Sequence, residues 1–141
     1  MPTTAASTAL STIAPLRVAE VMHWGLVSCP ANASLGVVAA LMSSERVHCV
    51  VVRGADEGSL WGVVSDLDLI AAASVRPLSV QQAGGTAMRP AVTIAPSESL
   101  DVATQLMART GVAHLVVVDP IERRPVGVLS TLDLARALSS A

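Results

Sequence analysis

Apolar residues follow two patterns along this chain, and each pattern occurs twice. Apolar positions recur at helical spacing from Leu35 to about Glu45 and again from Ser99 to about Arg109, which predicts two helices. A nearly continuous run of strand-forming residues follows each helix, over Val47–Val52 and His114–Val118. Such runs are typical of strands that are buried on both faces. The pattern therefore predicts an α+β fold made of two similar halves.

One stretch of the first half, Gly62–Leu69, returns almost intact as Gly127–Leu134. Each copy predicts a short apolar strand after the glycine, a serine at the N-cap and a helix with an aspartate in its first turn. The sequence interval between the two aspartates, Asp68 and Asp133, is 133 − 68 = 65. An internal repeat of this length indicates two copies of one structural unit. Upstream, we expect the interval to become 66, as set by two pairs of identical residues: Pro30 with Pro96, and Met22 with Met88.

The other elements are predicted from apolar periodicity and turn residues. The first half should contain a helical turn at 17–22, a loop with His23 and Trp24, a strand at 25–29, a helix capped by Ser34, a polar turn at 54–58, a strand at 60–64 and a helix from Ser65 to about Ala73. A linker over 74–82, which Gly84-Gly85 interrupts just before the second half, should lead to a strand at 91–95, a strand at 126–129 and a C-terminal helix. The predicted domains are a flexible tail at 1–16, a first repeat at 17–74, a linker at 75–82 and a second repeat at 83–141.

The composition argues against nucleic acid as a partner. Hydrophobic residues make up 52% of the chain, yet it has no Phe or Tyr and only two Trp, so the core must be aliphatic. Such a chain offers few aromatic platforms on which bases could stack. Nine arginines, no lysine and eleven acidic residues give a net charge of −2 without any basic run.

Several other functional classes lack their characteristic residues. Cys29 and Cys49 do not have the spacing of a metal or redox motif, so we expect both to be reduced. The N-terminus lacks the basic start and apolar core of a signal peptide, and no segment approaches the roughly 18 apolar residues that cross a bilayer. We therefore expect a cytoplasmic protein without membrane contact. No catalytic constellation, phosphate-binding glycine loop or metal cluster is evident, so we expect neither an enzyme nor a required cofactor.

The repeated elements resemble the CBS domain, a family named after cystathionine beta-synthase. The resemblance rests on the order of elements, the repeat interval of 65, Val21-Met22 before the first strand and the Gly-apolar-apolar-Ser-x-x-Asp stretch in both halves. The run Gly111–Asp119 is also similar to the corresponding strand of family members. The resemblance covers residues 17 to 139 and implies a tandem pair, or Bateman module. Such a pair has two pseudo-twofold-related strand-helix-strand-strand-helix repeats, each a small sheet packed against two helices.

The Ser-x-x-Asp pairs have two interpretations, which are compatible. A serine three residues before an acid is the ordinary capping box of a helix. The resemblance implies a second role, in which Asp68 and Asp133 bind the ribose hydroxyls of an adenosine ligand and Ser65 and Ser130 lie beside the ribose or phosphate. A carboxylate can accept both hydroxyl hydrogens, and a helix N-terminus favours phosphate.

The resemblance also implies which residues line each site, since family members share each site between the two halves. Asp133 should then face 17–22 with Val47-His48, and Asp68 should face 83–88 with 112–114. His48 matches a phosphate-contacting histidine of the family and His114 a neighbouring basic position; the alternative for each is a histidine bonded to backbone at the mouth of a strand. The full set of expected ligand-binding residues is Asp68, Asp133, Ser65, Ser130, His48, His114, Val47, Val112, Ala113, Met22 and Met88.

The resulting functional hypothesis is a regulatory module that senses an adenine nucleotide or other adenosyl compound in the cleft between the two repeats. The candidate ligands are AMP, ADP, ATP and S-adenosylmethionine, and family members commonly form homodimers. The alternative hypothesis is a module with the same fold that binds no nucleotide and serves dimerisation or protein interaction.

Overall fold

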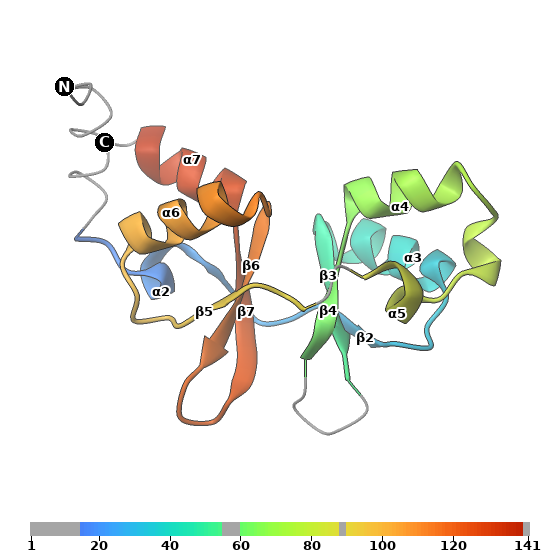
Figure 1. The fold of residues 1–141 in the computed structure, drawn as a ribbon, viewed down its shortest axis with the longest axis horizontal. Helices are drawn as coiled ribbons and strands as arrows, with labels where there is room; N and C mark the ends of the chain where they lie inside the picture. The colour runs from blue at the N-terminus through green and yellow to red at the C-terminus, as the bar shows by residue number, and fades with distance from the viewer. Residues whose placement is uncertain (1–14, 55–59, 88–89, 140–141) are drawn as a thin grey trace. The chain divides into compact units, whose positions relative to one another are not determined.

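A computed structural model gives the fold of residues 15–54, 60–87 and 90–139 (Figure 1). The chain is α+β, as predicted, and it forms two compact units. Unit 1 combines the segment up to Gly25 with residues 92–141, and unit 2 consists of residues 26–91. Most of the predicted tail at 1–16 and of the predicted turn at 54–58 lies outside the described residues.

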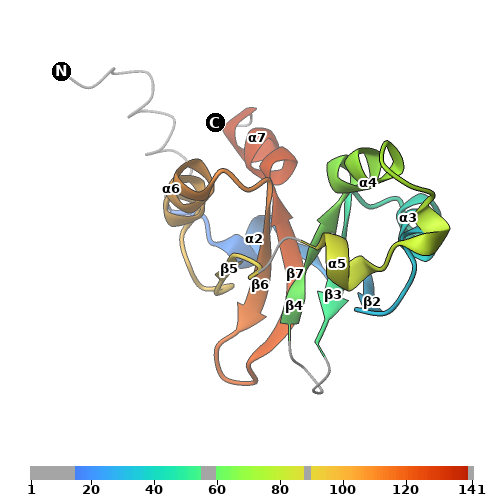
Figure 2. The ribbon, with the colours of Figure 1, turned by 45° about the vertical axis from the view of Figure 1, so that its right-hand side comes forward.

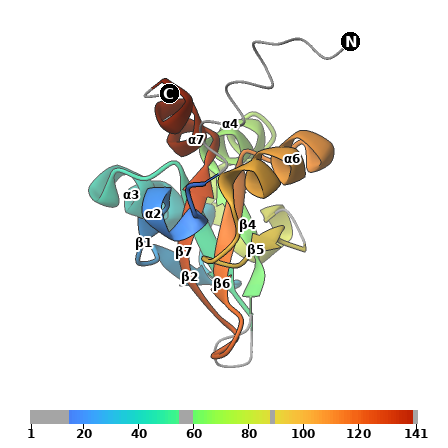
Figure 3. The same ribbon diagram turned by 90° about the vertical axis from the view of Figure 1, so that its left-hand side faces the viewer.

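Unit 1 contains a sheet of four strands in the order β1-β7-β6-β5. Strands β6 and β7 form a long antiparallel hairpin, β5 runs parallel to β6, and β1 pairs antiparallel with β7. Figure 3 shows α2 and β1 beside β7. Leu100, Leu115 and Leu129 are fully buried in the unit's aliphatic core. The elements are α2 (Val18–Val21), β1 (His23–Trp24), β5 (Thr93–Ile94), α6 (Leu100–Thr110), β6 (His114–Asp119), β7 (Arg124–Ser130) and α7 (Thr131–Ser139).

Unit 2 has a sheet of three described strands in the order β2-β3-β4, with β2 parallel and β4 antiparallel to the central β3 (Figure 2). Its separate core is built around Leu35, Val50 and Val64. Val50, Val51 and Val52 are all buried, as expected for a strand covered on both faces. The elements are β2 (Ser28–Pro30), α3 (Leu35–Glu45), β3 (Cys49–Arg53), β4 (Leu60–Ser65), α4 (Asp66–Ala73), η1 (Leu78–Val80) and α5 (Ala83–Thr86).

Each unit includes a short helix that comes directly before the main stretch of the other unit along the sequence: α2 before residues 26–91, and α5 before residues 92–141. Helix α2 joins unit 1 through the bond from the Val18 N–H to the Glu98 carbonyl, and α5 joins unit 2 through the bond from the Ala83 N–H to the Ala33 carbonyl, both 2.8 Å long. These two bonds are equivalent, because the donors and the acceptors both repeat at the interval of 65 (83 − 18 and 98 − 33). The units are therefore completed by exchanged segments.

The predicted change of interval from 65 to 66 is wrong. Ser28 pairs with Val51 and Thr93 with Val116, so the interval is 65 in the first strands too. Met22 and Ala87 both end short helices as C-caps, which makes Ala87, and not Met88, the counterpart of Met22. The identical residues suggested the wrong alignment, because neither the Pro30 position nor the Met22 position requires a particular residue type. Pro30 is exposed at a strand end, and the Met22 position tolerates the much smaller Ala87.

A further local prediction is wrong, because His23 and Trp24 form strand β1 and not a loop. Gly84-Gly85, expected only to interrupt the linker, lie inside helix α5. A Cβ on Gly84 would lie 2.9 Å from the Ala31 Cβ, so glycine here permits close packing of α5. The predicted bounds of the helix at Leu35–Glu45, with its Ser34 cap, are confirmed, because the Ser34 hydroxyl accepts the Val37 N–H at 3.2 Å.

Candidate functional site

In unit 2, the repeated motif forms a reciprocal capping box at the start of α4. The Ser65 N–H donates to Asp68 Oδ2 at 2.8 Å, and the Asp68 N–H donates to the Ser65 hydroxyl at 3.2 Å. The Asp68 side chain is half-buried. Within the part of the chain that the structure describes, no donor is bonded to its other carboxylate oxygen, Oδ1. Among those residues, a ligand hydroxyl would therefore displace no donor from this oxygen.

Asp66, two residues before Asp68, forms a pair with His48. His48 Nδ1 is 3.0 Å from Asp66 Oδ2, and the Asp66 N–H donates to the His48 carbonyl at 2.9 Å. Both side chains are exposed. Because Asp66 engages Nδ1, the pair orients the His48 ring and leaves its Nε2 for another partner.

In unit 1, the same capping box has nearly the same dimensions. The Ser130 N–H donates to Asp133 Oδ2 at 2.8 Å, and the Asp133 N–H donates to the Ser130 hydroxyl at 3.2 Å. The surroundings differ, because Asp133 is only 3% exposed and is the one buried charged side chain among the described residues. Its second oxygen, Oδ1, lies 3.2 Å from His23 Nδ1.

Glycine at position 127 allows His23 to come this close. Strand β1 pairs with β7 by placing His23 opposite Val128 and Trp24 opposite Gly127. A Cβ on Gly127 would lie 2.1 Å from the His23 carbonyl oxygen, a distance that no side chain tolerates. Strand β1 is also bonded to helix α2, since Trp24 Nε1 donates to the Ala19 carbonyl at 3.0 Å.

Cys49, which lies beside the motif in unit 2, has a thiol whose pKa is raised well above its ordinary value. Cys49 is opposite Ser65 in the β3–β4 ladder and is buried. Burial, assisted by the negative charge of Asp66, raises the pKa of the Cys49 thiol to about 12. Burial also raises the pKa of Cys29, although the Arg53 charge opposes the shift. Both cysteines are free, as predicted.

A model of the CBS domain family matches residues 18–75 and again residues 84–140. The chain belongs to the CBS domain family. The two matches make it a tandem CBS pair, which confirms the resemblance inferred from the repeated motif. No curated protein matches the chain.

Solved CBS structures share this fold. The CBS domain protein PAE2072 from Pyrobaculum aerophilum, complexed with AMP, is 28% identical, with a TM-score of 0.76 over 89% of this chain and 100% of that one. The CBS domain pair of protein MJ0100, in complex with 5-methylthioadenosine and S-adenosyl-L-methionine, is 20% identical, with a TM-score of 0.78 over 88% and 96% of the two chains. The CBS domain of a bacterial CNNM/CorC family Mg²⁺ transporter, in complex with ATP, is 18% identical, with a TM-score of 0.79 over 94% of each.

The predicted site residues of this CBS pair fall into two groups, one in each unit. Unit 1 brings His114 opposite Ser130 in the β6–β7 ladder, and the Ala113 carbonyl accepts the Thr131 N–H. Val112 packs against the unit 1 core, and Met22 is buried in it. In unit 2, Val47 packs against the core beside the exposed His48. Met88 lies outside the described residues.

The sequence interpretation missed two residues that contact the motif region. Asp66 could have been found, because an acid at the first helical position lies close to the end of the preceding strand. His23 carried no such signal, because it meets Asp133 only through the exchange of α2 and β1 into unit 1. His23 and Asp133 lie near opposite ends of the sequence.

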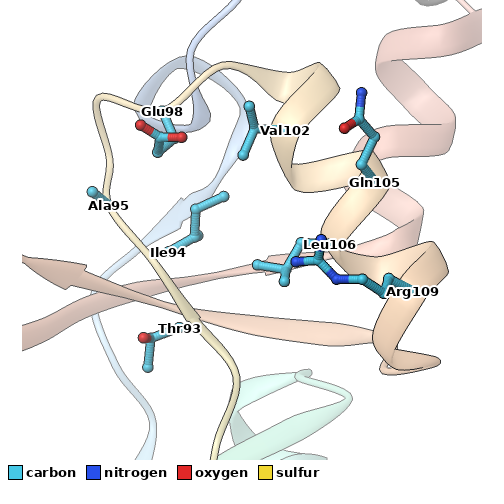
Figure 4. Close-up of a pocket in the computed structure, with 8 residues that line it drawn as sticks. All are labelled: Thr93, Ile94, Ala95, Glu98, Val102, Gln105, Leu106 and Arg109. Carbon is cyan, nitrogen blue, oxygen red and sulfur yellow. The ribbon is translucent and has the colours of Figure 1, made fainter.

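Unit 1 also has a shallow pocket of about 290 Å³ between the β5 segment and α6 (Figure 4). Thr93, Ile94 and Glu98 line one side, and Val102, Leu106 and Arg109 line the other. None of the predicted site residues lines this pocket, so it is separate from the capping motif.

No group of three or more His, Cys, Asp or Glu side chains in the described ranges is arranged to hold a metal ion. None of the helices described is both long and apolar enough to cross a bilayer.

Proposed function

We propose that this CBS pair is a non-catalytic regulatory module that binds an adenine nucleotide or other adenosyl compound at its Ser-x-x-Asp motifs. Asp68 accepts the ribose hydroxyls in this proposal, and His48 lies near the phosphate. AMP, ADP, ATP and S-adenosylmethionine are the candidate ligands. Binding regulates by population shift, because a ligand favours the conformation for which it has higher affinity.

The observation that carries the proposal is the state of the Asp68 carboxylate. One oxygen is held at 2.8 Å by the Ser65 N–H, which fixes the direction of the group, while the other has no bonded donor among the described residues. The carboxylate also lies in the first turn of α4, where the partial positive charge of the helix terminus favours a phosphate. A fixed acceptor beside an anion-favouring helix end suits a nucleoside phosphate.

The similar structures support the same ligand class. PAE2072 is described with AMP and the MJ0100 pair with two adenosyl compounds. The transporter CBS domain is described with ATP. These structures hold different ligands on one fold, so the choice among adenosyl compounds is left to experiment.

Isothermal titration of nucleotide-free protein with each candidate ligand tests the proposal. Asp68→Asn is the informative variant, because the amide oxygen can still accept the Ser65 N–H while the negative charge is lost. We expect roughly tenfold or greater weakening of the tightest ligand, the scale of a hydrogen bond to a charged group. Asp101→Asn, in the first turn of α6, is the control for a charge change at a helix start. Absence of binding by all four ligands would overturn the proposal.

A specific observation also favours homodimerisation, through the outer face of α4. Leu67 is 71% exposed and Ile70 is 69% exposed, and their spacing of three residues puts them on one side of the helix. Exposed apolar side chains that gather on one face mark interaction surfaces. Sedimentation of a Leu67→Glu, Ile70→Glu variant should show a monomer where the parent protein is a dimer. A monomeric parent would contradict this second proposal without affecting the first.

A further inference from the structure

We propose that His23 competes with the ligand for Asp133 and so lowers the affinity of the unit 1 motif for adenosyl compounds, most strongly at acidic pH. This inference rests on the proposed function, since it concerns the regulation of one of the two motifs.

The carboxylate of Asp133 has no oxygen left without a partner. Oδ2 accepts the Ser130 N–H at 2.8 Å, and Oδ1 lies 3.2 Å from His23 Nδ1. Only 3% of Asp133 is exposed. A ribose that approaches this group must take the place of the His23 ring, whereas the Asp68 oxygen needs no such displacement among the described residues.

The His23 backbone is fixed, but its ring is free to leave. The strand is held against β7 by its pairing with Val128 and by the close approach at Gly127. The imidazole is 70% exposed, so rotation about the side-chain bonds can move it into solvent. A ring with these properties can block the carboxylate reversibly without unfolding the strand.

The charges around the pair favour an effect of pH. The elements packed on His23 carry Arg17 and Glu20 beside α2, Asp133 and Arg136 on α7, and Arg124 at the far end of β7. Glu20 accepts the Arg17 N–H and Arg124 pairs with Glu122, so Asp133 is the acid that His23 contacts. Imidazoles ordinarily gain a proton as the pH falls from 8 to 5. An imidazolium binds a carboxylate more tightly than a neutral ring does, so ligand binding at Asp133 should weaken on acidification.

The two motifs offer an internal contrast. By the interval of the repeat, the sequence counterpart of His23 is Met88, a residue that cannot pair with a carboxylate. The histidine of unit 2, His48, contacts Asp66 and not the Asp68 carboxylate. Acid-sensitive competition of this kind is therefore expected for Asp133 alone.

The test is titration with adenosine at pH 5.5 and pH 8, in an Asp68→Asn background that isolates the unit 1 motif. Adenosine carries no phosphate, so a direct attraction between His23 and phosphate does not enter. Adding His23→Met should tighten binding about two- to fivefold at pH 5.5, the scale of one exposed ion pair, and should remove most of the pH dependence. Ile121→Met, at a position in the β6–β7 turn that is 90% exposed, is the control and should leave the pH dependence in place.

Unchanged or weaker binding in the His23→Met protein would overturn the inference, as would an unchanged pH profile. Absence of adenosine binding in the Asp68→Asn background, with and without His23→Met, would also overturn it. In either case, the proposed function would still be supported if the parent protein binds a candidate ligand and Asp68→Asn weakens that binding. A parent protein that binds none of the candidate ligands would instead overturn both.

Discussion

The two copies of the Ser-x-x-Asp motif have the same backbone geometry and different surroundings. Both capping boxes have bonds of 2.8 and 3.2 Å, yet Asp133 is buried against His23 while Asp68 is half-buried with one oxygen lacking a donor among the described residues. The part of the motif that starts the helix is thus the same in both units. The surroundings of the carboxylate differ, which shows that a repeated sequence motif does not ensure equivalent surroundings.

In unit 1, β1 approaches β7 closely at Gly127, and a single substitution can remove this approach. Gly127→Ala would place a Cβ 2.1 Å from the His23 carbonyl oxygen, so the strands must separate. We expect a loss of at least about 2 kcal/mol in the free energy of unfolding, measured with urea. Gly85→Ala is the control, because no atom lies within 4 Å of its added Cβ. Equal stability of the two variants would show that β1 is not held in this way.

Alkaline pH should destabilise unit 2, which contains both cysteines of the chain. The folded pKa of Cys49 is about 12 against a reference value of 9.0, so the folded state holds the proton more tightly. This contribution is complete below pH 9 and is lost as the pH rises toward 12. At pH 10.5 the loss should be about 2 kcal/mol. Urea unfolding of Cys49→Ala between pH 8 and pH 11 should give a flatter profile than the parent protein. Parallel profiles would contradict the assignment.

Equivalent helices in the two units end with different residues in the left-handed conformation. Helix α6 ends at Gly111 with φ of 73°, whereas α3 ends at Arg46 with φ of 56°. A residue with a Cβ pays about 1 kcal/mol for this conformation. Arg46→Gly should therefore raise the free energy of unfolding by about 0.5 kcal/mol or more, and Gly111→Ala should lower it by about 1 kcal/mol. Destabilisation by both would show that Arg46 makes a compensating contact.

The smallest expected effect is at the β6–β7 turn, where unit 1 has Asp119 and the equivalent position of unit 2 is Gly54. The N–H groups of Glu122 and Ile121 lower the pKa of the exposed Asp119 carboxyl. The sign follows, because the stabilisation is present above the ordinary pKa of an aspartate and is lost as the pH falls through the lowered folded value. Thermal melts of Asp119→Asn from pH 6 to pH 2 should show a slightly weaker acid dependence than the parent. A stronger dependence would contradict this account.

Local sequence signals predicted the elements that local interactions determine. The apolar spacing and the Ser34 cap predicted α3, and the two capping boxes were evident from Ser65 and Ser130. Strand β1 was not predictable in this way, because two residues show no periodicity and the strand forms only where Gly127 admits its backbone.

The candidate site was predictable only in part, for a related physical reason. The type of the acidic residue and its place in the helix follow from the sequence of a few neighbours. Burial of Asp133 and its contact with His23 depend on the exchange of a segment from near the other end of the sequence, which no local pattern encodes. The ligand-binding roles of the predicted residues stay predictions until the titrations are made.

The most direct test of the account is a calorimetric titration of AMP into the parent protein, Asp68→Asn and Asp133→Asn at neutral pH. Among the described residues, Asp68 has one carboxylate oxygen without a donor, whereas Asp133 is paired with a histidine. We therefore expect that Asp68→Asn removes the tighter binding and that Asp133→Asn retains it. Loss of the tighter binding in Asp133→Asn, with normal binding in Asp68→Asn, would contradict the account.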